Sequence, residues 1–181
     1  LVLTSGQMEE SAMEINKVTL VGVINNMKEI SNTDSMVTLH VKDDFERFPK
    51  FICRTRMLTD VKERDHVEAI GFIREDISGD SSTRIIVNTI AKEKTMLAAA
   101  FPEATGTYFY PGKTEILMTG EIVKIKKENN WDRYIIKTDD KETGEKTYIP
   151  ASRYSAGKAL NFKNGDHVCL IAKMATDRKS V

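Results

Sequence analysis

The stretch Arg64-Asp65-His66-Val67-Glu68-Ala69-Ile70 occurs a second time in the chain, as Gly165-Asp166-His167-Val168-Cys169-Leu170-Ile171. The offset between the two copies is 101 residues, from Asp65 to Asp166. Three further echoes keep the same order at similar offsets: 97 from Phe51 to Tyr148, 98 from Gly22 to Gly120, and 96 from Asp43 to Asp139. Loops of unequal length would produce this drift. We infer a duplicated unit of roughly 80–100 residues, a usual size for one domain.

The composition predicts a soluble globular chain of one or two domains: 181 residues, 40% apolar and 30% charged. No apolar run approaches the ~20 residues that cross a membrane, and the first residues lack the features of a signal peptide. The 27 Lys and Arg residues balance 27 Asp and Glu residues. Zero net charge argues against coating of nucleic acid by bulk charge, but it permits a local basic groove.

The reactive side chains predict neither catalysis nor a bound metal. Cys53 and Cys169 are interpreted as reduced core residues, which favours a cytoplasmic location. His66 and His167 occupy the same repeat position and are interpreted as strand-start residues, since no metal-ligand spacing surrounds them. The sequence contains no Gly-rich phosphate loop and no Ser/His/Asp spacing. We therefore expect no cofactor and no enzymatic activity.

Each repeat contains the same succession of predicted β-strands. In the first repeat, β-branched or alternating stretches predict strands over 18–24, 36–41, 50–55, 66–74 and 84–90, with a short helical piece over 57–63. In the second repeat, strands over 115–126, 133–138, 146–151 and 167–174 follow the first four, and 154–160 fills the helical position. Gly22 and Gly71 interrupt their strands, which suggests bulges or bends suited to closing a small barrel.

Five strands with a small helix between the third and the fourth is the order of an OB barrel. We therefore predict an all-β fold of two tandem five-stranded OB barrels. The expected divisions are a flexible leader (1–12), a first domain (13–95), a linker with aromatic residues (96–112) and a second domain (113–181). Only ten residues follow Ile171, whereas twenty separate its counterpart Ile70 from Ile90. The second barrel is thus expected to lack its fifth strand, unless the chain continues or another segment closes the edge.

A family resemblance lies in four stretches of the first repeat: Asn16 to Gly22, three residues after Met13, then Val37 to Val41, Phe51 to Arg54, and Lys62 to Ile73. They resemble, in order, the opening strand, the second strand, the third strand and the lead into the fourth strand of bacterial single-stranded DNA-binding proteins. The resemblance covers about residues 13–95 and is faint in the second repeat. It implies an OB fold, binding of single-stranded DNA, partners in replication or recombination, and self-association.

Several departures from that family point to a divergent relative, such as one from a plasmid, a phage or another mobile element. The helix before the fourth strand is shorter than in the family. The first repeat has none of the tryptophans that the family stacks on bases. Two units in one chain also differ from the usual one-barrel subunit.

OB barrels bind single strands by combining cationic grooves with aromatic platforms. In the first repeat we predict contacts from Phe45, Arg47, Phe48, Lys50, Arg54 and Arg56. Alternation along the third strand should turn Phe51 and Cys53 to the core, and Lys50, Arg54 and Arg56 to solvent. Phe45 and Phe48 lie among charges before that strand, where they either stack on bases or fill the core.

In the second repeat we predict contacts from Lys124, Lys126, Trp131, Arg133 and Tyr134. Trp131 follows the polar Asn129-Asn130 turn between the first two strands, a region with which OB folds grip ligands. It stacks on a base, covers the end of the barrel, or meets a protein partner. The lysines are equally compatible with a solvated strand face.

Two functions follow. The first is a single-stranded DNA-binding protein of replication, recombination or transfer; RNA is also compatible, because stacking reads either nucleic acid. The alternative is a tandem OB scaffold that docks on a protein complex. Salt separates them, since nucleic-acid binding weakens steeply as salt rises and an apolar interface does not. A homo-oligomer is expected, and no membrane association.

Overall fold

The computed structural model describes residues 13–43, 45–76, 83–92, 112–156, 158 and 161–174. Its elements are β1 (Asn16–Glu29), β2 (Asp34–Lys42), β3 (Glu46–Arg47), β4 (Lys50–Arg54), the 3-10 turn η1 (Thr55–Leu58), β5 (His66–Glu75), β6 (Thr83–Lys92), β7 (Lys113–Glu128), β8 (Trp131–Asp139), β9 (Lys146–Tyr154) and β10 (His167–Ala172). The predicted leader and nearly all of the predicted linker lie outside these residues. Within them, no helix is long and apolar enough to cross a membrane.

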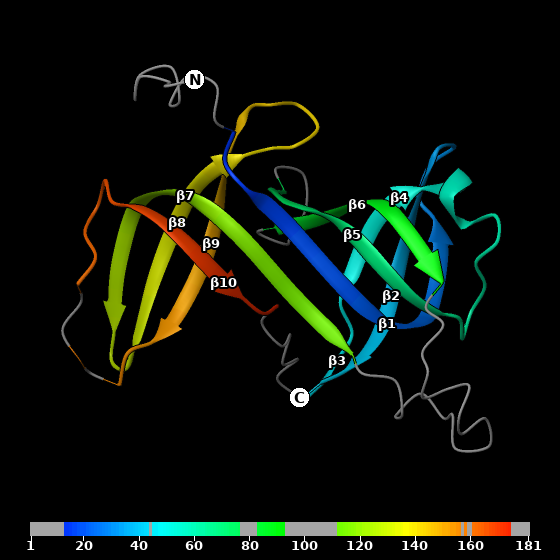
Figure 1. Cartoon of the computed structure of the whole chain (residues 1–181), viewed down its shortest axis with the longest axis horizontal. Helices are drawn as coiled ribbons and strands as arrows, with labels where there is room; N and C mark the ends of the chain where they lie inside the picture. The colour runs from blue at the N-terminus through cyan, green and yellow to red at the C-terminus, as the bar shows by residue number, and fades with distance from the viewer. Residues whose placement is uncertain are drawn as a thin grey trace, which may run out of the picture.

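The first repeat closes into a five-stranded barrel, at the right of Figure 1. Strand β1 pairs antiparallel with β2 and with β5, β2 pairs with β4, and β5 pairs with β6. A parallel contact between Ile52 of β4 and Ile86 of β6 completes the ring. Five strands closed in the order β1-β2-β4-β6-β5, with η1 between β4 and β5, form an OB barrel, so the predicted fold class is confirmed.

The second repeat reproduces the first four strands of that barrel. Strands β7, β8 and β9 pair in succession, and β10 pairs with β7. The described residues contain no counterpart of β6, and residues 175–181 are not among them. The open side leaves Val168 and Leu170 only half-buried, whereas their counterparts Val67 and Ala69 are fully buried. Within the described residues, the second repeat therefore has four strands and an open side.

The equivalent glycines of the two repeats, Gly22 and Gly120, each lie where two strands approach closely. A Cβ atom on Gly22 would lie 2.6 Å from the carbonyl oxygen of His40, and one on Gly120 would lie 2.3 Å from that of Lys137. Just beyond each glycine the pairing slips, between Ile24 and Asn26 and again at Ile122. A glycine followed by a bulge bends the strand, as closing a small barrel requires.

The doubled stretch is the turn into the fourth strand. The Ile24 N–H donates to the Asp65 carbonyl and the Arg64 N–H donates to the Ile24 carbonyl, both at 2.9 Å. The Asp65 side chain accepts from the Lys62 N–H at 3.0 Å. Arg64 has a φ of 74°, the left-handed region that favours glycine. The second repeat has the same bonds and places glycine at that position, through Ile122, Lys163, Gly165 and Asp166.

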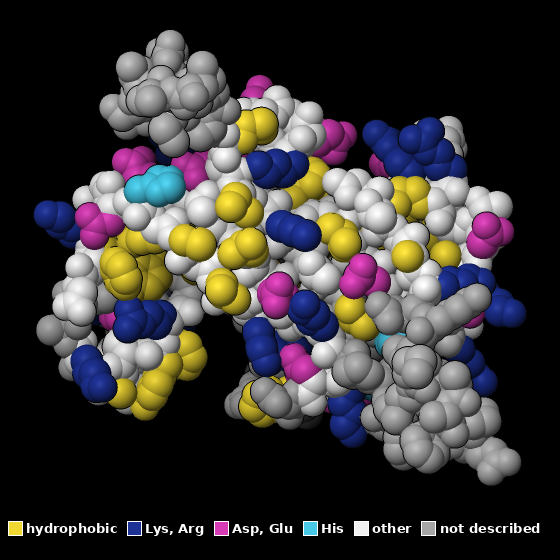
Figure 2. All heavy atoms as spheres, in the orientation of Figure 1, with side chains coloured by type: hydrophobic (Ala, Val, Ile, Leu, Met, Phe, Trp, Pro, Cys, Tyr) yellow, Lys and Arg dark blue, Asp and Glu magenta, His cyan; other side chains and the backbone are white. Residues whose placement is uncertain are grey.

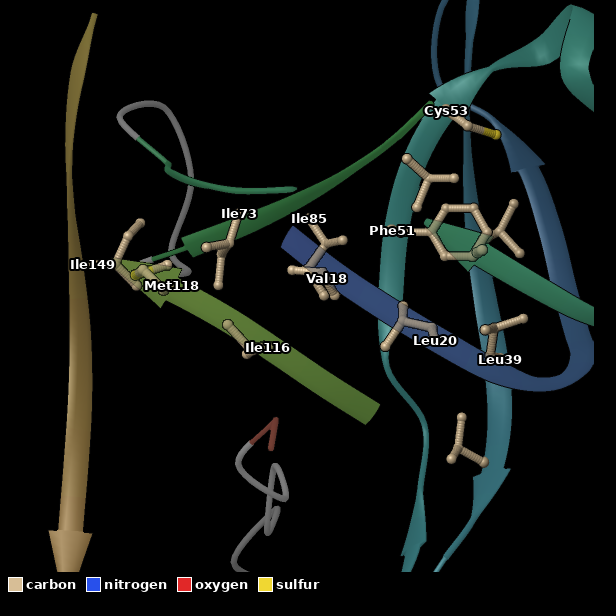
Figure 3. Packing of buried hydrophobic residues seen from close by; sticks show 14 of the residues in the cluster. Val18, Leu20, Leu39, Phe51, Cys53, Ile73, Ile85, Ile116, Met118 and Ile149 are labelled. Carbon is tan, nitrogen blue, oxygen red and sulfur yellow. The ribbon is translucent and has the colours of Figure 1, made fainter. Parts of the chain in front are cut away.

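Strands β1 and β7 join the repeats, and they lie side by side in Figure 1. Their inward side chains belong to one hydrophobic core, from Phe51 and Leu39 through Val18 and Ile116 to Ile149 (Figure 3). The buried Asn16 closes the junction: its amide donates to the carbonyls of Ile73 and Asp139 at 2.7 and 3.1 Å, and accepts from the Ile73 N–H at 3.0 Å. The repeats therefore share both apolar and polar contacts.

Two predicted echoes are wrong in register. Leu39 lies opposite Ile24, and Ile136 lies opposite the equivalent Ile122, so the second strands correspond at an offset of 97 and Asp43 corresponds to Asp140, not to Asp139. Val37 lies opposite Phe51, and its counterpart Tyr134 lies opposite Ala151, so the third strands correspond at an offset of 100 and not 97. An odd shift of three residues exchanges the two faces of a strand. Tyr148 is therefore the counterpart of Phe48, not of the buried Phe51.

Two smaller predictions also need correction. Cys53 is buried, as expected, and burial raises the pKa of its thiol to about 11. Cys169 lies on the outer face of β10 and is exposed, so it is not a core residue. A helical piece is predicted over 154–160, but Tyr154 is the last residue of β9, and residues 155, 156 and 158 are not helical. Residues 157, 159 and 160 are not described.

Candidate nucleic-acid interface

The outer face of β2 and β4, here called the first-repeat face, consists of four cross-strand rows. In order they are His40 with Phe48, Thr38 with Lys50, Met36 with Ile52, and Asp34 with Arg54. Phe48 is 53% exposed and stacks on His40, with ring centroids 5.0 Å apart and an interplanar angle of 21°. The core alternative for Phe48 is therefore wrong. An exposed flat ring beside basic residues is what base stacking requires.

The predicted division of β4 into a core side and a solvent side is confirmed. Phe51 and Cys53 are buried, while Lys50 and Arg54 are exposed. Arg54 donates to Asp34 at 3.0 Å, but half of its side chain stays accessible. Arg56, on η1, is exposed beside an open depression of about 490 Å³ that Lys28 and Thr59 also line. Lys50, Arg54 and Arg56 therefore place basic side chains along β4 and η1.

The segment before β4 contains one exposed residue, Phe45, and one residue whose side chain is held by contacts within the protein, Arg47. Phe45 is 60% exposed, with the Arg47 guanidinium 5.7 Å from its ring centre. Arg47 itself forms an ion pair with Asp43 at 3.4 Å and donates to the Met174 carbonyl. Only 11% of its side chain is exposed. The Arg47 side chain is therefore engaged by Asp43 and Met174 and is nearly buried. Its predicted role as a phosphate contact is wrong.

The outer face of β8 and β9, here called the second-repeat face, has the same four rows. They are Lys137 with Tyr148, Ile135 with Pro150, Arg133 with Ser152, and Trp131 with Tyr154. Trp131 is 47% exposed and Tyr154 59% exposed, and their rings meet edge to face at 5.4 Å. Tyr148 is 41% exposed, in the row that holds Phe48 in the first repeat. Each face thus carries an exposed ring at the same position.

Strand β7 extends the second-repeat face with lysines. Lys124 and Lys126 are both exposed and pair with Ile135 and Arg133 of β8. Glu128 accepts from Lys126 at 3.0 Å and from Arg133 at 2.8 Å, and these hydrogen bonds lower the pKa of its carboxyl group. Within the described part of the chain, Lys124 forms no ion pair. Glu128 therefore offsets part of the positive charge of this face but not the charge of Lys124.

Tyr134 does not lie on either face. It is 7% exposed, belongs to the hydrophobic core, and meets Phe162 edge to face at 6.5 Å. Burial raises the pKa of its hydroxyl, and the carboxylate of Asp132 adds to this effect. We therefore correct the predicted site by removing Tyr134.

Two aromatic residues of the second-repeat face, Tyr148 and Tyr154, were not predicted from the sequence. Both have even numbers within β9, so period-two alternation places them on the side opposite the buried Thr147 and Ile149. That signal was present, but the wrong offset for the third strand assigned Tyr148 to the core position. Trp131 was predicted, and it begins β8 directly after the Asn129-Asn130 turn.

The face shown in Figure 2 differs from these two faces. It is formed largely by β5, β1, β7 and β10, and its hydrophobic side chains lie among both basic and acidic ones. On the outer side of β10, Ile171 is 78% exposed and lies opposite Leu117 of β7. The described residues contain no cluster of His, Cys, Asp and Glu that could hold a metal ion.

Comparison with known proteins supports the fold. No protein-family model and no curated protein matches this chain. Among solved structures, it is similar to a deletion mutant of the single-stranded DNA binding protein from Thermus aquaticus. The TM-score is 0.57 at 14% sequence identity, over 92% of this chain and 89% of that chain. At this identity the similarity establishes the shared fold over nearly the whole of both chains.

Proposed function

We propose that this chain binds single-stranded DNA on the first-repeat and second-repeat faces, and that it acts in DNA replication, recombination or transfer, including transfer of a mobile element or phage. One observation carries the proposal. Two faces that correspond row by row both combine exposed rings with basic side chains. In OB folds the face of the second and third strands is the one that binds oligonucleotides. The named function of the structurally similar Thermus protein is consistent with this proposal.

Base stacking supplies the short-range part of the proposed binding. Phe48 already lies flat on His40, which fixes the ring in a stacking orientation. Trp131 and Tyr154 form a second aromatic pair, and Tyr148 presents a single ring. Each stacked base contributes ~1–3 kcal/mol, and stacking accepts every base type because all bases have a π-face. Binding without strong sequence preference follows.

Phosphate contacts supply the long-range part. Lys50 and Arg56 on the first repeat, and Lys124 on the second, have no ion pair among the described residues and are exposed to solvent. Arg54 must exchange its contacts with Asp34 and Glu142 for a phosphate. Each neutralised phosphate of a single strand contributes about −0.7 to the slope of log K against log salt. A neutral chain can bind DNA in this way because its positive charges are local.

The test compares two matched variants, Phe48→Ala and Tyr148→Ala, in fluorescence anisotropy titrations of labelled oligo-dT. Each removes one exposed ring from the equivalent row of a face, and each should weaken binding by about 5- to 150-fold, the equivalent of ~1–3 kcal/mol. Ile171→Ala is the control, because it truncates an exposed side chain on another surface. Unchanged affinity in both variants would refute the proposed faces.

The alternative of a protein scaffold has one observation in its favour. Ile171 and Leu117 place apolar surface on the outer side of β10 and β7, away from both faces. Such a patch suits self-association or a partner from replication or recombination. Ile171→Asp should then disrupt the complex and leave the affinity for oligo-dT unchanged, as measured by light scattering and anisotropy.

A further inference from the structure

The two repeats are related by a half-turn about an axis between β1 and β7. The glycines 22 and 120 give an offset of 98 for the first strands of the repeats. At this offset the counterpart of Val18 is Ile116, and Val18 pairs with Ile116 across the junction. A residue that lies opposite its own counterpart marks a two-fold axis. The neighbouring pairs agree. At the same offset Thr114 is the counterpart of Asn16 and Met118 is the counterpart of Leu20, whereas Asn16 lies opposite Met118 and Leu20 lies opposite Thr114, as a two-fold axis requires.

Contacts between the repeats obey the same rotation. Asp140, in the loop after β8, forms an ion pair at 2.8 Å with Arg74 near the end of β5. Asp43 is the counterpart of Asp140, and it pairs at 3.9 Å with Lys173, just after β10. Each repeat therefore uses the loop after its second strand to contact the end of the fourth strand of the other. These contacts hold the two repeats in the two-fold arrangement.

The rotation fixes how the two faces are oriented. Phe48 and Tyr148 occupy the same row of their faces, so the rotation that exchanges β1 and β7 also exchanges these rings. A half-turn reverses every direction that runs across its axis. A single strand has a 5′ and a 3′ end, and equivalent faces favour equivalent strand direction. Two tandem barrels related by simple translation would instead favour one direction throughout.

We infer that the chain binds single-stranded DNA as two segments that run antiparallel, one on each face. This inference rests on the proposed function and specifies its substrate: two strands of opposite direction, or one strand that turns back on itself. A straight strand that crosses both faces meets one of them in the disfavoured direction. The chain is thus built to hold paired antiparallel segments, and not to extend one strand.

The test uses energy transfer between two short oligo-dT strands bound to one chain. Oligonucleotides of about ten nucleotides suit one OB face, which binds about 4–16. One strand carries a donor and the other an acceptor, either at like ends (both 5′ or both 3′) or at unlike ends. Antiparallel segments bring unlike ends together. Transfer should therefore be higher for the unlike-end pair than for the average of the two like-end pairs.

Each outcome has a definite meaning. Average transfer for the two like-end pairs above that of the unlike-end pair would overturn the antiparallel arrangement while leaving the proposed function intact, and so would a stoichiometry of one oligonucleotide per chain. A failure of the oligonucleotides to bind would refute the proposed function itself. The variant with both Trp131→Ala and Tyr148→Ala should lose transfer but keep bound donor, because it weakens only the second-repeat face. Circular dichroism confirms that this variant is folded, and transfer that survives in it would contradict the assignment.

Discussion

Replacement of Trp131 by alanine separates base stacking from a structural role. Trp131 is 47% exposed, so roughly half of its surface is buried, and its ring meets Tyr154 edge to face. Half of a Trp side chain corresponds to about 100 Å², or about 2.5 kcal/mol at ~25 cal/mol per Å². Partial burial in the unfolded chain reduces this value. We expect Trp131→Ala to lower the free energy of unfolding by about 2 kcal/mol, less than the ~3–5 kcal/mol of a fully buried aromatic residue.

The same substitution should weaken binding of oligo-dT by about 5- to 150-fold, which corresponds to ~1–3 kcal/mol for one stacked base. Urea unfolding measures the first effect and anisotropy of labelled oligo-dT measures the second, at a temperature where the variant is fully folded. Phe162→Ala is the matched control. Phe162 is 39% exposed and packs on Tyr134, away from both faces, so its removal should cost stability but no affinity.

The stacking role of Trp131 would be refuted by an affinity within twofold of the wild type in a folded variant. A loss of stability above ~3 kcal/mol with unchanged affinity would show that the ring is structural. If the variant binds oligo-dT normally, is stable, and fails to assemble with itself or a partner, Trp131 belongs to a protein interface.

Three other outcomes follow from the structure. Replacing Lys50, Arg54 and Arg56 together by alanine should weaken binding at low salt and reduce the salt slope by roughly one unit or less per lost contact; an unchanged slope would exclude this face. Gly120→Ala should destabilise the fold by ~1–3 kcal/mol in urea unfolding, because its Cβ would lie 2.3 Å from a carbonyl oxygen; wild-type stability would contradict the close approach. Burial raises the pKa of the Asp140 carboxyl, but hydrogen bonds from the Thr143 and Glu142 N–H groups and the charge of Arg74 outweigh it, so the pKa lies below its ordinary value. The stability that this carboxylate provides should be present above about pH 4 and fall as the pH drops further, and Asp140→Asn should reduce that loss in acid unfolding.

Strand order was predictable because local patterns determine it. The alternation of residues along β4 predicted that Phe51 and Cys53 face the core. The repeated Asp-His stretch marked two equivalent turns, in each of which an aspartate side chain accepts a backbone hydrogen bond. Register was harder to predict, since the apolar residues of β4 and β9 can be superposed at a sequence offset of either 97 or 100 residues. Only the partners across the sheet decide between these offsets, and they place Tyr148 outside.

The site residues were less predictable than the strands. Arg47 and Tyr134 have the residue types of a binding site, but long-range contacts with Met174 and Phe162 bury them. The half-turn between the repeats was also not visible in the sequence. It depends on the pairing of β1 with β7, two strands almost a hundred residues apart, for which neither strand carries a local signal.

The most direct test of the proposed function is a titration of Trp131 fluorescence with poly-dT at two salt concentrations. Trp131 is the single tryptophan of the chain, so the signal reports on the second-repeat face alone. If the chain binds single-stranded DNA by stacking and phosphate contacts, saturating poly-dT quenches the fluorescence, and the affinity falls steeply as salt rises. Fluorescence that saturating poly-dT leaves unchanged at low salt would contradict this function.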